Sequence, residues 1–187
     1  MNVESAARAP IRVALDKIMR PIVDEKIAPF VLQHYPTACN MTGKKCRVCS
    51  SLLRRYKPDE DRSSHNVHRD SEAIVTVVIS LSDYGTDYQG GLYVSNGHER
   101  HVLPLMRGDA LVHQSDLLHG VLLHDDPGSL RYSWILWFKD DDRCVHRSYE
   151  WSRACAESGG NRICEYLQGL RASYNPAGPW LVPVTIC

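Results

Sequence analysis

Two histidines and one aspartate form the strongest chemical pattern in the sequence. His68 and Asp70 are two residues apart, so in an extended segment their side chains lie on the same face. His119 follows a long segment rich in strand-forming residues. Two imidazoles and one carboxylate occupy one face of an octahedral iron(II), and three positions then stay open for a co-substrate and O₂. The pattern predicts an iron site made of His68, Asp70 and His119.

Two further histidines compete for the same role. His65 lies three residues before His68, a spacing that does not suit one face of an extended strand. His113, with Asp116 nearby, lacks the strand pattern that follows Asp70. We therefore expect neither His65 nor His113 to be a ligand.

A basic residue lies inside an otherwise apolar strand near residue 130. Alternation over 130–138 places Arg131 and Ser133 on one face, together with Ile135 and Trp137. A buried arginine is costly unless it is paired. A bound dicarboxylate would supply the partner, because a guanidinium matches carboxylate geometry in a bidentate way. The Ser133 hydroxyl could add a donor to the same ligand.

The segment 50–140 must position these side chains, and its apolar pattern is typical of strands. Turn signals rich in glycine, asparagine and proline separate the runs. The strands do not alternate with helices, so a parallel βαβ sheet is disfavoured. We expect a mainly β fold with flanking helices (α+β), of the jelly-roll or cupin-like kind. The predicted strands are 51–57, 73–81, 91–95, 101–105, 109–113, 120–124 and 130–138.

The two flanks of this core have helical spacing. In 1–49, apolar residues recur at helical intervals, and Pro10, Pro21 and Pro29 are expected to divide the stretch into short helices before a loop. These helices would support the core. In 141–187 the pattern predicts a helical pair and an irregular tail.

The chain has seven cysteines at irregular spacing, which is a poor disulfide framework. Cys46 and Cys49 form one Cys-x-x-Cys pair, and Cys39 could join them at a zinc ion, but a single pair is a weak signal. Idle thiols are the preferred interpretation, with a redox pair as the alternative. The cysteine pattern favours a reducing, cytoplasmic compartment, and no signal peptide or membrane span is seen in the sequence.

Taken in order, the motifs of 52–138 resemble the 2-oxoglutarate/iron(II) dioxygenase superfamily, and within it the prolyl 4-hydroxylase-like branch. The stretch covers a little under half of the chain. The joint order is more specific than any single piece. The pieces are Arg55-Tyr56-Lys57-Pro58, His68-Arg69-Asp70-Ser71, Ile79-Ser80-Leu81-Ser82, Gln89-Gly90-Gly91-Leu92, Pro104-Leu105-Met106-Arg107-Gly108-Asp109-Ala110, Leu118-His119-Gly120-Val121 and Leu130-Arg131-Tyr132-Ser133.

This resemblance implies a double-stranded β-helix with iron at its mouth. It implies that Arg131 binds the distal carboxylate of 2-oxoglutarate and that Tyr56 donates a hydrogen bond to the same molecule. The implied cofactors are Fe(II), 2-oxoglutarate and O₂, with ascorbate as an optional addition. One departure is that collagen-type prolyl hydroxylases use a lysine ten residues after the second histidine. Here that position is Ser129, and the basic residue comes two positions later.

The resemblance implies hydroxylation of a protein or peptide side chain, with proline first, coupled to conversion of 2-oxoglutarate to succinate. A small-molecule hydroxylase of the same class is the alternative, and a catalytically silent binding module with this fold is the rival. A formal net charge of zero disfavours a nucleic-acid or membrane surface. Nucleic-acid demethylases of this class carry a second arginine six residues after the first, where this chain has Trp137.

Overall fold

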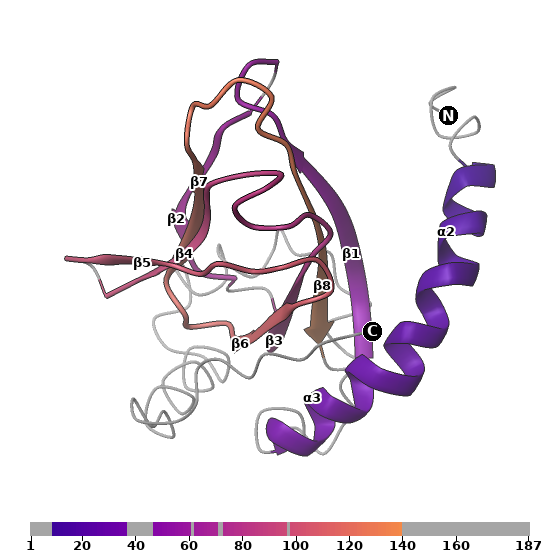
Figure 1. Cartoon of the computed structure of the whole chain (residues 1–187). Coiled ribbons are helices and arrows are strands. Elements are labelled where there is room, and N and C mark those ends of the chain that lie inside the picture. The colour runs from indigo at the N-terminus through magenta and orange to yellow at the C-terminus, as the bar shows by residue number, and fades with distance from the viewer. Residues whose placement is uncertain (1–8, 37–46, 61, 71–72, 97, 140–187) are drawn as a thin grey trace, which may run out of the picture.

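The computed structural model describes residues 9–36, 47–60, 62–70, 73–96 and 98–139. This part is mainly β with helices at its N-terminal side, as the sequence predicts (Figure 1). The predicted helical pair at 141–187 lies outside the described residues. The strands are β1 (Arg47–Tyr56), β2 (Ser64–His68), β3 (Val75–Ser80), β4 (Gly90–Ser95), β5 (Arg100–Val102), β6 (Ala110–Gln114), β7 (His119–Leu123) and β8 (Arg131–Lys139).

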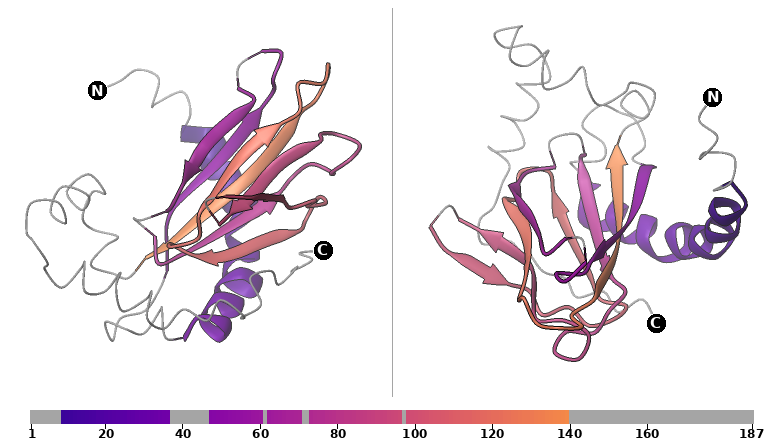
Figure 2. Two further views of the ribbon diagram at one scale, coloured as in Figure 1. Left: turned by 90° about the vertical axis from the view of Figure 1, so that its left-hand side faces the viewer. Right: turned by 90° about the horizontal axis from the view of Figure 1, so that it is seen from above.

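The strands form two four-stranded antiparallel sheets. One sheet has the order β1-β8-β3-β6 and the other has the order β2-β7-β4-β5. Sequence neighbours therefore alternate between the sheets, except for β4 and β5, which form a hairpin within one sheet, and β1 and β2 are each an edge strand of their sheet. Seen from above, the helices lie outside the strands, and the β4–β5 hairpin projects on the opposite side (Figure 2). Each predicted strand corresponds to an observed one, and β2 is an additional strand that the sequence pattern did not mark.

Strand β3 is buried along its whole length, which explains its continuous apolar sequence. Val75, Val77 and Ile79 face the helices and form one core cluster with residues of β6 and β8. Thr76 and Val78 face the other sheet. A central strand with two covered faces holds its register firmly, because a slip of one residue would exchange the two faces.

The N-terminal helices cover the outer face of the first sheet. They are α2 (Ala9–Ile22), the π-helical turn η1 (Val23–Ile27) and α3 (Ala28–His34). Ile27 and Val31 are fully covered and pack in the cluster with β3 and β8. None of the helices in the described part of the chain is long and apolar enough to cross a membrane.

The prediction that the prolines divide this region into separate short helices is wrong. Pro21 lies inside α2, Pro29 lies in the first turn of α3, and the chain stays helical between them. Proline removes one backbone donor and crowds the preceding turn. Between the two prolines lies a π-helical turn, in which the Ala28 N–H donates to the Val23 carbonyl five residues earlier.

Cys49, on β1, is disulfide-bonded and is therefore not the idle thiol that the sequence predicted. All other cysteines, including Cys39 and Cys46, lie outside the described residues. A sulfur in a disulfide offers no thiolate to zinc. The disulfide therefore disfavours a zinc site that includes Cys49.

A pair of neighbouring alanine substitutions tests the contact between α3 and the sheet. Val31 is completely buried, whereas Leu32 is 43% exposed. We expect Val31→Ala to lower the free energy of unfolding by about 2 kcal/mol, because two buried methyl groups are lost and a cavity remains. Leu32→Ala should change it by less than about 0.5 kcal/mol. Urea unfolding measures both, and equal losses would contradict the packing of α3 on the sheet.

Candidate metal centre

His68, Asp70 and His119 lie together at the adjoining ends of β2 and β7, the edge strand of the second sheet and its neighbour. His68 is the last residue of β2, His119 is the first residue of β7, and the two are paired across the strands. Asp70 follows β2 at the start of a turn. The turn is closed by a hydrogen bond from the Ala73 N–H to the Asp70 carbonyl. The structure thus brings together the three side chains that the sequence predicted as ligands.

The ligand-type atoms of these three residues all lie within 4.8 Å of one another. His68 Nε2 is 3.3 Å from Asp70 Oδ1, and His119 Nε2 is 3.8 Å from Asp70 Oδ2. The two imidazole rings are 4.4 Å apart between centroids. Both Nε2 atoms therefore face the same carboxylate.

Backbone carbonyls fix which nitrogen of each imidazole can bind a metal. His68 Nδ1 lies 2.8 Å from the carbonyl oxygen of Asn66, and His119 Nδ1 lies 3.1 Å from that of Leu117. A carbonyl oxygen only accepts, so Nδ1 carries the hydrogen in both rings. In the neutral ring, the lone pair is then on Nε2, the atom that faces Asp70.

Two side chains of the first sheet hold the Asp70 carboxylate in place. Thr76 Oγ1 donates to Oδ2 over 2.7 Å, and Trp137 Nε1 donates to the same oxygen over 3.2 Å. Neither residue was among the site residues that the sequence pattern predicts. The alternation of β8 already placed Trp137 on the face of Arg131, and that signal could have identified it.

The charges in this group depend on one another. Burial would raise the pKa of Asp70, but the hydrogen bond with His68, the charge of His119 and the Thr76 hydroxyl hold it far below its usual range. The hydrogen bond to Asp70 raises the pKa of His68. Burial lowers the pKa of His119. The centre therefore holds an ionised carboxylate beside an imidazole that favours the neutral, metal-binding form.

A β-bulge in β2 places the side chain of His65 on the same face as that of His68. Their spacing in the sequence predicted that they would not share a face. His68 lies three positions after His65 on β2, but their partners on β7, Val121 and His119, are only two positions apart. The extra residue in β2 rotates the chain so that both rings point inward. The rings of His65 and His68 meet edge to face at 4.5 Å between centroids.

His113, the other competing histidine, lies behind the centre on β6. Its ring is 4.6 Å from that of His119, and the side chain is fully buried. Burial lowers the pKa of His113 to about 4, so the ring is neutral at physiological pH. It is not among the three residues whose ligand atoms gather.

Gly120, next to His119, allows the strands to approach closely here. A Cβ at this position would lie 2.5 Å from Tyr93 Oη and 3.0 Å from the His65 carbonyl oxygen. Real Cβ atoms do not come this close to other heavy atoms, so a larger residue would displace β7. The absence of a side chain at Gly120 therefore helps to set the position of His119.

A cavity of about 80 Å³ lies between the two sheets and opens beside the centre. The face of β8 that the sequence predicted, with Arg131, Ser133, Ile135 and Trp137, lines it. The complete lining is Leu52, Arg54, Tyr56, His65, His68, Asp70, Val78, Leu92, His119, Val121, Arg131, Ser133, Ile135 and Trp137.

Arg131 is a buried cation in this cavity, and most of its donors are unused. The residue is 1% exposed. Its Nη1 donates to Ser133 Oγ over 3.3 Å, whereas Nε and Nη2 are buried without a hydrogen-bond partner. No carboxylate in the described part of the chain forms an ion pair with it. Such a group is costly unless an anion completes its hydrogen bonds.

Tyr56, also predicted to bind the co-substrate, is buried in the same cavity. It pairs with Arg131 across β1 and β8, and the guanidinium carbon lies 5.7 Å from its ring centre. Tyr88 contacts the guanidinium from another side, at 5.6 Å. Burial raises the pKa of the Tyr56 phenol, so it remains a neutral hydrogen-bond donor. The structure thus brings Tyr56, Ser133 and Arg131 together.

No protein-family model matches the chain, and neither does any curated protein. Solved structures do. The chain resembles an oxidoreductase of the 2OG-Fe(II) oxygenase family from Burkholderia pseudomallei, with 18% identity over 60% of this chain and 50% of that one and a TM-score of 0.46. It also resembles a prolyl-4-hydroxylase from Pseudomonas putida, with 19% identity over 59% and 58% of the chains and a TM-score of 0.44.

A further similar structure is the non-heme alpha ketoglutarate dependent epimerase SnoN from nogalamycin biosynthesis. The identity is 17%, and the TM-score is 0.50 over 70% of this chain. The match spans 58% of the length of SnoN. The chain therefore shares its fold with SnoN.

Proposed function

We propose that this protein is an Fe(II)- and 2-oxoglutarate-dependent oxygenase. The observation that carries the proposal is the buried Arg131, whose two unused donors lie in the same cavity as His68, Asp70 and His119. A chelated dicarboxylic acid would join the two ends of this cavity. The fold shared with a non-heme alpha ketoglutarate dependent enzyme supports the same conclusion.

The proposal includes the architecture of the core. In the orders β1-β8-β3-β6 and β2-β7-β4-β5, consecutive strands fall in opposite sheets except for the hairpin of β4 and β5. This arrangement supports a double-stranded β-helix formed by residues 50–140, with the N-terminal helices as its support. In such a fold the space between the sheets can hold a small ligand, as in other jelly rolls.

The donor set fits ferrous iron. Two neutral imidazoles and one carboxylate form the three-residue face that non-haem oxygenases use, and it leaves positions open for further ligands. The outer contacts are also of the expected kind, since each Nδ1–H meets a carbonyl and Asp70 accepts from Thr76 and Trp137. Thiolates, which select zinc in closed structural sites, are absent from this group of ligand atoms.

The chain's own residues would bind and shield the co-substrate. Arg131 would hold the distal carboxylate through Nε and Nη2, and Tyr56 and Ser133 lie beside it to donate further hydrogen bonds. Val78 and Leu92 line the cavity and would exclude water from the bound acid. When bound, iron would supply the activation of O₂ that couples conversion of 2-oxoglutarate to succinate with substrate oxidation.

We propose hydroxylation as the reaction. The sequence resemblance supports a peptidyl side chain as substrate, with proline as the first to assay. A small-molecule hydroxylase of the same class is the alternative.

The proposed activity is tested by succinate formation from 2-oxoglutarate in the presence of Fe(II) and O₂. In the same assay, Arg131→Met should raise the KM for 2-oxoglutarate about 100-fold, because the charged hydrogen bonds to the distal carboxylate are lost. Arg100→Met is the matched control. Arg100 lies on β5, over the Tyr93 ring and outside the cavity lining, so this variant should leave the KM unchanged.

Absence of succinate from iron-loaded protein would contradict the activity. An unchanged KM in Arg131→Met would contradict the assigned role of the arginine.

The hydrogen bonds to Asp70 give a second prediction, which does not depend on turnover. Thr76→Val removes a donor to the carboxylate, so we expect the affinity for Co²⁺ to fall about 10- to 100-fold. Isothermal titration calorimetry on the metal-free protein measures this change. Ser80→Ala is the control, since this buried hydroxyl of β3 donates to the Ser82 carbonyl instead. If both variants bind Co²⁺ like the wild type, Asp70 is not a ligand that Thr76 positions.

A further inference from the structure

A second arginine, Arg54, lies in the cavity without a role in the proposed co-substrate site. Leu52, Arg54 and Tyr56 alternate along β1 and all line the cavity. Arg54 pairs with Ser133 across β1 and β8 and is half-buried. Among the residues that the structure describes, no carboxylate forms an ion pair with Arg54. Its neighbour Arg55, on the opposite face, is exposed and pairs with Glu60 at 3.4 Å.

His65 lies near Arg54 on the other sheet. It lines the same cavity. Burial lowers the pKa of its imidazole, and the charges of His68, Arg54 and Arg62 lower it further. Among the described strands, β1 and β2 are each an edge of their sheet. Arg54 and His65 thus provide a guanidinium and an imidazole donor to the cavity from two different sheets.

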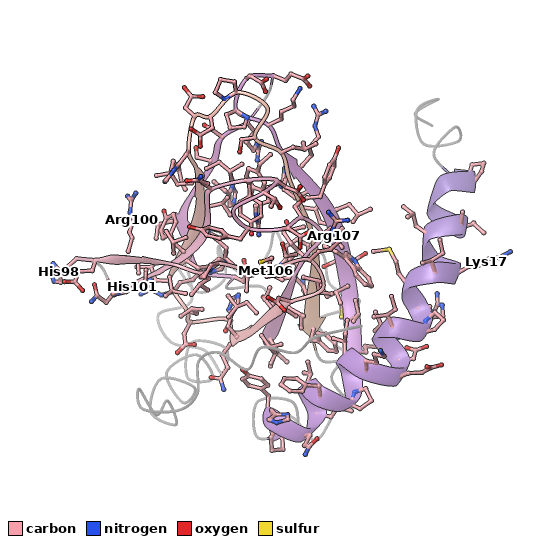
Figure 3. The ribbon with its side chains drawn as sticks, in the orientation of Figure 1. Lys17, His98, Arg100, His101, Met106 and Arg107 are labelled. Atoms are coloured by element: carbon pink, nitrogen blue, oxygen red, sulfur yellow. The ribbon has the colours of Figure 1, made fainter. Side chains whose placement is uncertain are left out.

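The cavity is rich in positive charge, and its carboxylate is already engaged. Its lining includes two arginines and three histidines but one acidic residue, Asp70. Asp70 faces His68 and His119 and accepts from Thr76 and Trp137, so it does not neutralise Arg54. Other basic side chains lie elsewhere: Lys17 on α2 and Arg100 and His101 on β5 project from the outer surface (Figure 3).

Aliphatic side chains also line the cavity and would suit a hydrocarbon group. Leu52 and Ile135 contribute from the first sheet, and Leu92 and Val121 contribute from the second. A ligand that matches this side of the cavity therefore has an aliphatic part and one anionic group.

We infer that Arg54 and His65 bind a carboxylate of the primary substrate, separately from the co-substrate carboxylate at Arg131. This assignment rests on the proposed function and narrows its substrate class to carboxylate-bearing compounds. Arg54 would form a bidentate ion pair with the substrate carboxylate, and an N–H of His65 would donate to it. The carboxylate comes either from a small aliphatic acid or from an acidic side chain of a peptide.

The test measures binding by calorimetry, with Zn²⁺ in place of iron and saturating 2-oxoglutarate, so that no turnover occurs. The small-molecule probe is hexanoate, with hexanamide as its uncharged counterpart. We expect hexanoate to bind at least 10-fold more tightly than hexanamide. Arg54→Met should remove this preference, and Arg55→Met, which loses the same charge on the outer face, should keep it.

A second pair of probes distinguishes the two sources of the carboxylate. Blocked peptides with the sequence Ala-Pro-Glu-Ala and Ala-Pro-Gln-Ala are titrated under the same conditions. Preference for the glutamate peptide that depends on Arg54 assigns the anion to a peptide side chain, whereas dependence in the hexanoate titration alone assigns it to a small acid. Lack of any preference dependent on Arg54 in both pairs overturns the inference.

Two controls keep the result separate from folding and from the proposed co-substrate site. Arg54→Lys retains the charge and should recover part of the preference, and thermal unfolding verifies that each variant is folded. Titration of 2-oxoglutarate should show unchanged affinity in Arg54→Met. If that affinity falls instead, Arg54 belongs to the co-substrate site and the inference is overturned. If wild-type protein binds no 2-oxoglutarate, the proposed function fails, while the hexanoate preference still reports on Arg54.

Discussion

The Asp70 carboxylate is the contact through which the two sheets form one centre. Its oxygens face imidazoles at the ends of β2 and β7 in one sheet, and they accept hydrogen bonds from Thr76 on β3 and Trp137 on β8 in the other. Four strands thus meet at one anion. An ionised carboxylate that is mostly removed from water needs all of these donors, because each missing one would leave charge uncompensated. The position of Asp70 therefore depends on the correct stacking of both sheets.

The charge of the whole chain conceals the charge of its cavity. The chain has equal numbers of basic and acidic residues, yet the cavity collects arginines and histidines around one engaged carboxylate. The surface shows the compensation, since Arg107 pairs with Asp83 and Asp87, and Arg20 pairs with Asp16. A neutral total disfavours nucleic acid as a partner, but it carries no information about small anions that bind between the sheets.

Period-two alternation predicted much of the fold and part of the site. It predicted the strands and the face of β8 that lines the cavity, because side chains along a strand point alternately to its two faces. It could not predict the bulge in β2, because an extra residue leaves no mark in the composition. For this reason the sequence did not place His65 on the same face as His68. The expected break at Pro21 did not occur, because the chain continues from α2 into a π-helical turn instead of leaving the helix. The alternation of β8 placed Trp137 on the face of Arg131, but it could not show that Trp137 donates to Asp70, since that contact joins segments distant in the sequence.

The cost of Arg131 argues against a silent binding module. A guanidinium buried with two unmet donors lowers the free energy of unfolding, and an apolar side chain of similar size would raise it. A module that binds partners through its outer surface has no use for such a group between its sheets. An anion that binds at this guanidinium raises the free energy of unfolding, by an amount that grows with the logarithm of the ligand concentration divided by Kd. With the proposed co-substrate bound, Arg131 would make the stability of the fold depend on the acid in its cavity.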